Sequence, residues 1–134
     1  MAITFQKRTN PTTDNLKETA PNFYRNGNPF TTAGCDGGNC TWYAWGRFCE
    51  VWYQADKTHG DTAAQMWPAT PNGNACHWVE HVNAHPNHFT TGTTPRPGAI
   101  ICWGYNGNPL GEEGHVAFVE EVFEDGSIEI SQSG

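Results

Sequence analysis

The 134-residue sequence has few positively charged residues. Seven Lys and Arg residues stand against 14 Asp and Glu residues, which gives a formal net charge of −7. No Lys/Arg cluster is present that could neutralise a run of phosphates, so we expect no nucleic acid partner. The same charge opposes strong attraction to any other anionic polymer or surface.

Long hydrophobic runs are also missing. No apolar stretch approaches the length of a transmembrane helix, and residues 1–4 do not begin a signal peptide, so we expect no membrane partner. The lack of a signal indicates either cytoplasmic synthesis with release by other means, or a domain excised from a longer chain. The length suits one domain, and 15 Gly and 9 Pro residues indicate extensive loops and turns.

The most informative segment places a cysteine at the first turn of a helix predicted over residues 39–53. Asn39 is a suitable N-cap, and the apolar residues beyond the cysteine recur at the spacing of one buried helical face: Trp45, Phe48, Cys49 and Trp52. The unpaired N–H groups and the positive end of the helix dipole favour thiolate over thiol at Cys40. The sequence therefore places a candidate nucleophile at Cys40.

A candidate base lies 75 residues later, where His115 begins a predicted strand over residues 115–123. Neutral imidazole can accept the thiol proton, and Gly114 before it is expected to leave room for a substrate chain. Further helices are predicted near 14–19, 62–66 and 74–84, and further strands over 99–103 and 127–132, with a hairpin turn at Asp125-Gly126. Helices followed by an antiparallel meander predict an α+β fold.

Four blocks of the sequence carry a family resemblance. They are G-N-C-T-W-Y-A-W-G-R-F (38–48), Gly73-Asn74-Ala75 followed by Trp78, P-G-A-I-I-C-W (97–103) and G-H-V-A-F-V-E-E-V (114–122). In this order and spacing they resemble the CHAP domain, the cysteine, histidine-dependent amidohydrolase/peptidase family. Within that family the chain most resembles domains of bacteriophage endolysins and tail-associated lysins of Gram-positive hosts.

This resemblance implies a papain-like α+β domain over residues 29–134, preceded by an N-terminal arm over residues 1–28. In such a domain the helix bearing Cys40 packs on a small antiparallel sheet bearing His115. It also implies a peptidoglycan hydrolase that lyses Gram-positive walls through a thioester. The bond is either the N-acetylmuramoyl–L-alanine amide or one in the stem or cross-bridge peptide. The implied location is the host cytoplasm until release to the wall, or the virion tail. Because the net charge of −7 opposes attraction to an anionic wall, we expect wall targeting to depend on a separate cell-wall-binding domain or subunit.

The third catalytic position departs from the commonest family pattern. Many CHAP domains place a Glu on the last strand with an Asn two residues later, whereas this chain has Gln132 and Gly134. Gln132 shares strand parity with Ile128 and Ile130, which are expected in the core, while Glu129 points to the opposite face. The Gln132 carbonyl oxygen can accept a hydrogen bond from imidazole, as an amide does in Cys-His-Asn sites.

Other site residues follow from position. The backbone N–H of Cys40 and the side-chain amide of Asn39 are candidate oxyanion donors, although Asn39 could serve as a helix cap instead. Trp103 and Tyr105 are candidate platforms for sugar or peptide stems.

Two alternatives to a cysteine hydrolase remain open. His77, His81 and His85 recur at i+4 near Cys76 and His88, and a zinc hydrolase could be built on His77 and His81. A wall-binding module without turnover is the second alternative, because Gln132 replaces the usual carboxylate. No cofactor is expected, and calcium is not supported, since the region before Cys40 has no D-x-D pattern.

The other cysteines admit two readings. Oxidation outside a cell would allow up to two disulfides among Cys35, Cys49, Cys76 and Cys102. We favour reduced thiols, because Cys49 and Cys102 lie in apolar segments that explain them by packing.

Overall fold

The computed structural model describes residues 5–8, 16–25, 28–34, 39–55, 73–86, 89–103 and 114–133. Three short helices come first, α1 (Leu16–Thr19), α2 (Pro21–Tyr24) and α3 (Pro29–Thr32), followed by the 16-residue helix α4 (Cys40–Ala55). The short 3-10 helix η1 (Ala75–His77) leads into α6 (Trp78–Asn83). Three strands complete the order: β1 (Ile100–Trp103), β2 (His115–Val122) and β3 (Ile128–Ser131).

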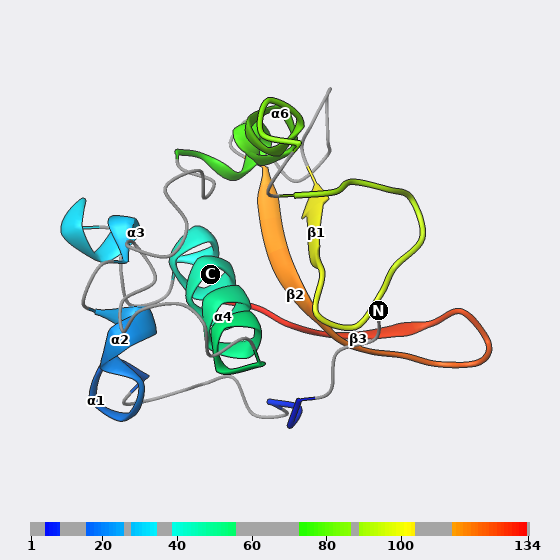
Figure 1. Cartoon of the computed structure of the whole chain (residues 1–134), viewed down its shortest axis with the longest axis horizontal. Helices are drawn as coiled ribbons and strands as arrows, with labels where there is room; N and C mark the ends of the chain where they lie inside the picture. The colour runs from blue at the N-terminus through cyan, green and yellow to red at the C-terminus, as the bar shows by residue number, and fades with distance from the viewer. Residues whose placement is uncertain are drawn as a thin grey trace.

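The strands form one antiparallel sheet in the order β1-β2-β3 (Figure 1). β1 pairs with β2 so that Trp103 lies opposite His115, and β2 pairs with β3 so that Phe118 lies opposite Ser131. Helices with a three-stranded antiparallel sheet make the predicted α+β fold, and the predicted strands agree with the observed ones to within one residue at each end.

Helix α4 lies between the short N-terminal helices and the sheet (Figure 1). Trp45 and Cys49 of the predicted apolar face are buried, whereas Phe48 and Trp52 are half-buried. Helix α4 is also covered on its other side, because α2 approaches it at Gly46. A Cβ on Gly46 would lie 2.5 Å from Tyr24 Cδ1, so only glycine permits this packing.

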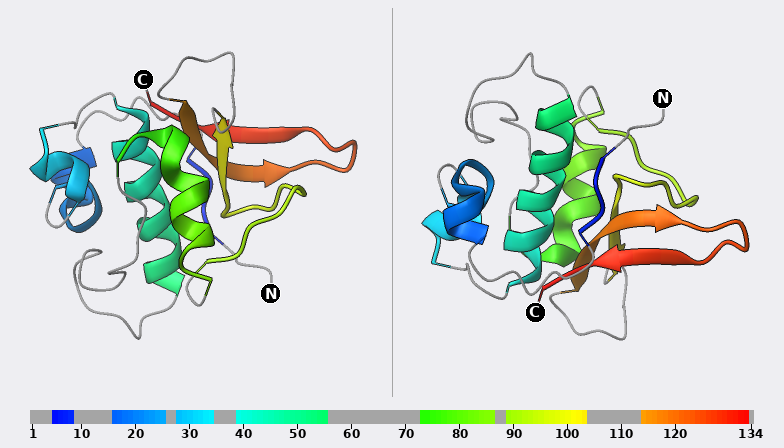
Figure 2. Two further views of the ribbon diagram at one scale, coloured as in Figure 1. Left: turned by 90° about the horizontal axis from the view of Figure 1, so that it is seen from above. Right: turned by 90° about the horizontal axis from the view of Figure 1, so that it is seen from below.

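The β2–β3 hairpin extends away from α4 (Figures 1 and 2). Its turn is the predicted one, with Gly126 at φ 88° and the Asp125 carboxylate accepting hydrogen bonds from the N–H and the hydroxyl of Ser127. A positive φ favours glycine, which explains the Asp-Gly pair at this turn.

Two sequence predictions are modified. The helix predicted over 74–84 begins as the 3-10 helix η1, and His85 lies beyond the end of α6. Ile128 and Ile130 are half-buried rather than core residues, and the buried residue of β3 is Ser131. The helix predicted at 62–66 lies outside the described residues.

The N-terminal arm contributes to the packed structure where it is described. The Phe5 and Phe118 rings meet edge to face at 5.6 Å, and Lys7 forms ion pairs with Glu121 and Glu129. Residues 5–8 therefore pack on β2 and β3. The boundary at residue 29 stays a prediction. None of the described helices is long and apolar enough to span a membrane.

Candidate active site

Cys40 is the first residue of α4 and is half-buried. Its side chain packs against a buried cluster that includes Ala75 of η1 and Val116 of β2. Val116 directly follows His115, so the start of α4 and the start of β2 border the same cluster. In both views of Figure 2 the two starts lie at the same end of the molecule. A proton transfer between the Cys40 sulfur and the His115 ring stays a prediction.

Asn39 caps α4 as the sequence suggests. Its side-chain oxygen accepts hydrogen bonds from the Thr41 N–H, at 3.0 Å, and from the Thr41 hydroxyl, while its backbone oxygen accepts from the Tyr43 N–H. The cap uses the oxygen of the side-chain amide and not its NH₂ group. Capping and donation to an oxyanion are therefore compatible at this residue.

His115 is hydrogen-bonded to Gln132 across the end of the sheet. His115 Nε2 lies 2.6 Å from Gln132 Oε1. Because an amide oxygen can only accept, this contact requires the hydrogen on Nε2, and in the neutral ring Nδ1 then keeps its lone pair. The bond therefore fixes both the orientation and the tautomer of the ring. Nδ1 is left as the nitrogen that can accept a proton.

Trp103 is the cross-strand neighbour of His115. The two ring centroids lie 5.6 Å apart, and the ring planes are inclined by 30°. Trp103 is half-buried. An aromatic face beside the imidazole is a suitable stacking surface for an apolar or sugar-like group. Tyr105, the second predicted platform, lies outside the described residues.

Gly114 has a different role from the predicted one. It adopts φ 74°, and a Cβ there would lie 2.5 Å from the Trp103 carbonyl oxygen and 2.9 Å from the Cys76 backbone nitrogen. The space beside Gly114 is filled by η1 and β1 rather than open to a substrate chain. Gly114 thus lets η1 close against the strand that carries His115.

The histidine cluster does not form a metal site where it is described. The rings of His81 and His85 stack at 4.7 Å, and His85 Nδ1 lies 2.9 Å from the His81 carbonyl oxygen. No group of three or more His, Cys, Asp or Glu side chains among the described residues could hold a metal ion. His88 lies outside those residues. The described geometry thus gives the zinc alternative no support.

The cysteines differ in their surroundings. Cys40, Cys49, Cys76 and Cys102 are reduced, and Cys35 lies outside the described residues. Burial raises the pKa of Cys102 to about 11, so Cys102 stays a protonated, weakly reactive thiol at neutral pH.

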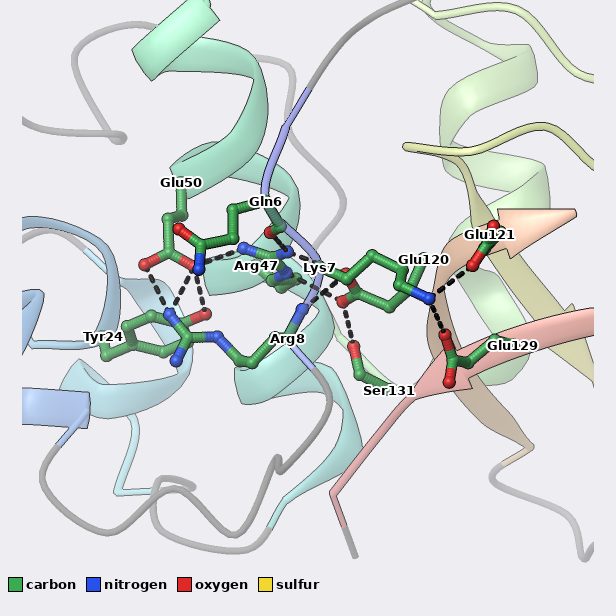
Figure 3. Close-up of polar contacts among 10 residues, drawn as sticks. All are labelled: Gln6, Lys7, Arg8, Tyr24, Arg47, Glu50, Glu120, Glu121, Glu129 and Ser131. Carbon is green, nitrogen blue, oxygen red and sulfur yellow. Dashed lines mark hydrogen bonds and ion pairs between the residues drawn. The ribbon is translucent and has the colours of Figure 1, made fainter.

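Sequence reasoning missed a buried charged network between α4, β2 and the N-terminal arm (Figure 3). Arg47 of α4 pairs with Glu120 of β2 and with Glu50, and Arg8 of the arm also pairs with Glu50. Burial alone would raise the pKa of Glu120, but hydrogen bonds from Arg47, Ser131 and the Arg8 N–H outweigh it and hold that pKa below its usual range. The available signal was the position of Glu120 directly after the apolar run of residues 116–119 in its strand.

Comparisons with known proteins identify the family of this chain. Residues 30–134 match the family described as CHAP domain. A protein named "Putative hydrolase" from Streptococcus mutans serotype c (strain ATCC 700610 / UA159) is 36% identical over 76 residues. The match covers 57% of this chain and 33% of that protein, so the chain spans about a third of the length of this relative. No solved structure matches the chain significantly.

Proposed function

Because the chain belongs to the CHAP domain family, we propose that it is a cysteine-dependent hydrolase that cleaves an amide bond of peptidoglycan. The observation that carries the proposal is the 2.6 Å contact between His115 Nε2 and Gln132 Oε1. It supplies the orienting partner that a catalytic imidazole requires, in a family named for a cysteine and a histidine. The similarity to a protein named as a hydrolase supports the reaction class.

The proposed reaction is acyl transfer through Cys40. His115 Nδ1 accepts the thiol proton, and the thiolate attacks the amide carbonyl carbon. The tetrahedral oxyanion receives hydrogen bonds from the Cys40 N–H and the Asn39 side-chain NH₂. Collapse breaks the C–N bond and forms a thioester, while His115 returns the proton to the leaving amine.

Hydrolysis of the thioester completes the cycle. His115 removes a proton from water, the resulting hydroxide attacks the thioester carbonyl, and the C–S bond breaks to give a carboxylic acid and the restored thiol. Gln132 holds the ring throughout, while Trp103 and Tyr105 stack on the substrate. None of these steps requires a metal ion or other cofactor.

The proposed substrate is the wall of a Gram-positive bacterium. Both the N-acetylmuramoyl–L-alanine amide and a stem or cross-bridge peptide bond suit this chemistry. The proposed setting is a bacteriophage endolysin or tail-associated lysin, acting from the host cytoplasm after release or from the virion tail. The net charge of −7 supports a separate wall-binding domain or subunit as its partner.

Turbidity of purified Gram-positive walls tests the proposal. The wild-type protein and a Cys76→Ser control should clear the walls, Cys40→Ser should not, and thiol alkylation should stop clearing while a chelator leaves it unchanged. Loss of clearing with chelator alone would favour the zinc alternative. Protein that pellets with walls but clears nothing would favour a binding module. Mass spectrometry of the released fragments would identify the cleaved bond from its new termini.

A further inference from the structure

One buried carboxylate lies at the junction of the three elements that carry the candidate catalytic residues. Arg47 Nε donates to Glu120 Oε2 at 2.9 Å, and Arg47 Nη2 donates to Glu120 Oε1 at 2.8 Å (Figure 3). The two side chains are 5% and 0% exposed. This two-point contact ties β2 to α4 with a defined orientation.

The same carboxylate also holds β3. The Ser131 hydroxyl donates to Glu120 Oε2 at 2.6 Å, and the Arg8 N–H donates to Glu120 Oε1 at 3.0 Å. The pairing of β2 and β3 shifts register between Val119 and Glu121, so Glu120 lies at a bulge. Glu120 faces the same Arg47 guanidinium as Phe118, whose ring centroid lies 5.1 Å from the guanidinium carbon.

The connections of Glu120 lead to the proposed site. Ser131 directly precedes Gln132, the hydrogen-bond acceptor of His115. His115 begins the strand that carries Glu120, and Cys40 begins the helix that carries Arg47. A change in the position of Ser131 therefore moves Gln132 relative to His115.

Energy alone does not explain this arrangement. A buried ion pair contributes little net stability, because the cost of desolvating both charges offsets their attraction. What it does supply is direction, since each hydrogen bond fixes an angle as well as a distance. Here all four bonds to Glu120 act between different elements.

We propose that Glu120 is a positioning residue for the candidate site, holding Gln132 through Ser131 and α4 through Arg47. This inference rests on the proposed function. Glu120 itself lies between β2 and α4 and touches no reacting atom. It acts by fixing the position of the His115–Gln132 pair.

Ser131→Ala tests the inference, because it removes one hydrogen bond and leaves the charge pair intact. Ser127→Ala is the matched control: it also removes a 2.6 Å bond from a serine hydroxyl to a carboxylate, in the exposed turn of the same hairpin. We expect the maximal rate of wall hydrolysis to fall about 10-fold to 100-fold in Ser131→Ala, with the half-saturating wall concentration unchanged. Ser127→Ala should match the wild type in both.

A second readout requires no substrate. Nitrogen-15 NMR should detect the His115 Nε2–H proton held by Gln132, and in Ser131→Ala that signal should shift and exchange faster with water. Glu120→Gln should do the same, with the neighbouring Glu121→Gln as its control. Because Glu120→Gln could lose its fold, Ser131→Ala decides the question.

A wild-type His115 signal in folded Ser131→Ala would overturn the positioning role. An altered signal with an unchanged rate would overturn it too. Wild-type protein that hydrolyses no wall would refute the proposed function instead, and the NMR comparison would still decide whether Glu120 holds the His115–Gln132 pair.

Discussion

Gln132 Oε1 accepts a hydrogen bond from His115 Nε2 at 2.6 Å, joining the start of β2 to the residue that follows β3. The bond leaves Nδ1 as the basic nitrogen. The acceptor is an amide, whereas the family resemblance implies a carboxylate at this position. Gln132 can orient the ring but cannot neutralise it when it is protonated.

Replacing Gln132 tests the importance of this acceptor. Gln132→Ala removes it, so the rate of wall hydrolysis should fall by about 10²-fold, the lower end of what general acid–base catalysis contributes. Gln132→Glu keeps an oxygen that accepts from Nε2–H and should retain most activity. The measurement is the initial rate of turbidity loss at equal protein concentration. Unchanged activity in Gln132→Ala would remove this residue from the site.

Glu120 is expected to make the free energy of unfolding depend on pH. Its pKa is lower in the folded protein than in the unfolded chain, so folding favours the ionised form. The corresponding stability is present above the unfolded-state glutamate pKa of about 4.3 and is lost as the pH falls through the lowered folded-state value. Thermal unfolding between pH 7 and pH 3 should show a decline below about pH 5.

Two variants distinguish the contributions of Glu120 and Asp125 to that decline in stability. A folded Glu120→Gln protein should be less stable at neutral pH, by about 3–5 kcal/mol, because Arg47 loses its buried partner, and its acid decline should be shallower. Asp125 also has a lowered pKa, because the Ser127 hydroxyl and N–H donate to it, so Asp125→Asn measures its separate share. If stability declined with acid as steeply in both variants as in the wild type, the role of Glu120 would be contradicted.

Packing between α2 and α4 depends on Gly46. Alanine in a helix interior is ordinarily favoured over glycine by about 1 kcal/mol, but its methyl here would meet the fully buried Tyr24 ring. Overpacking typically costs about 1–3 kcal/mol, so Gly46→Ala should lower the Tm. Gly92→Ala is the control, because a Cβ at Gly92 meets nothing within 4 Å. A higher Tm for Gly46→Ala would show that α2 can move aside.

Residues 5–8 should contribute to stability although the family match begins at residue 30. The Arg47 guanidinium carbon lies 5.5 Å from the Phe5 ring centroid and 5.1 Å from that of Phe118. Phe5→Ala should therefore cost about 1–2 kcal/mol, measured by urea unfolding. Lys7→Ala, on the exposed side of the same segment, should change little. Equal effects of the two substitutions would contradict a packed arm.

Local patterns predicted much of the fold. The four apolar residues spaced along α4, the Asn39 cap and the Asp125-Gly126 turn are short-range signals, and each corresponds to an observed element. Gln132 was identified from the resemblance, as the residue where many CHAP domains have a Glu, and the structure places its side-chain oxygen 2.6 Å from His115 Nε2.

Long-range relationships were not predictable in this way. Arg47 and Glu120 are 73 residues apart, and no local pattern pairs them. The helix was expected to bury one face, yet Arg47 and Glu50 are buried as well. Arg47 meets Glu120 of β2 and the Gln6 carbonyl oxygen of the arm, while Glu50 accepts a hydrogen bond from the Tyr24 hydroxyl of α2. The role of Gly114 depended similarly on η1, whose position only the folded chain reveals.

The central claim is that Cys40 carries the acyl group during hydrolysis. Intact-mass spectrometry of protein quenched in acid while it digests purified walls tests this most directly. The account predicts an added mass equal to a wall fragment, located at Cys40 by peptide mapping, released by hydroxylamine and missing in Cys40→Ser. A Cys40→Ser protein that digests walls as fast as the wild type, or an adduct at another residue, would contradict it.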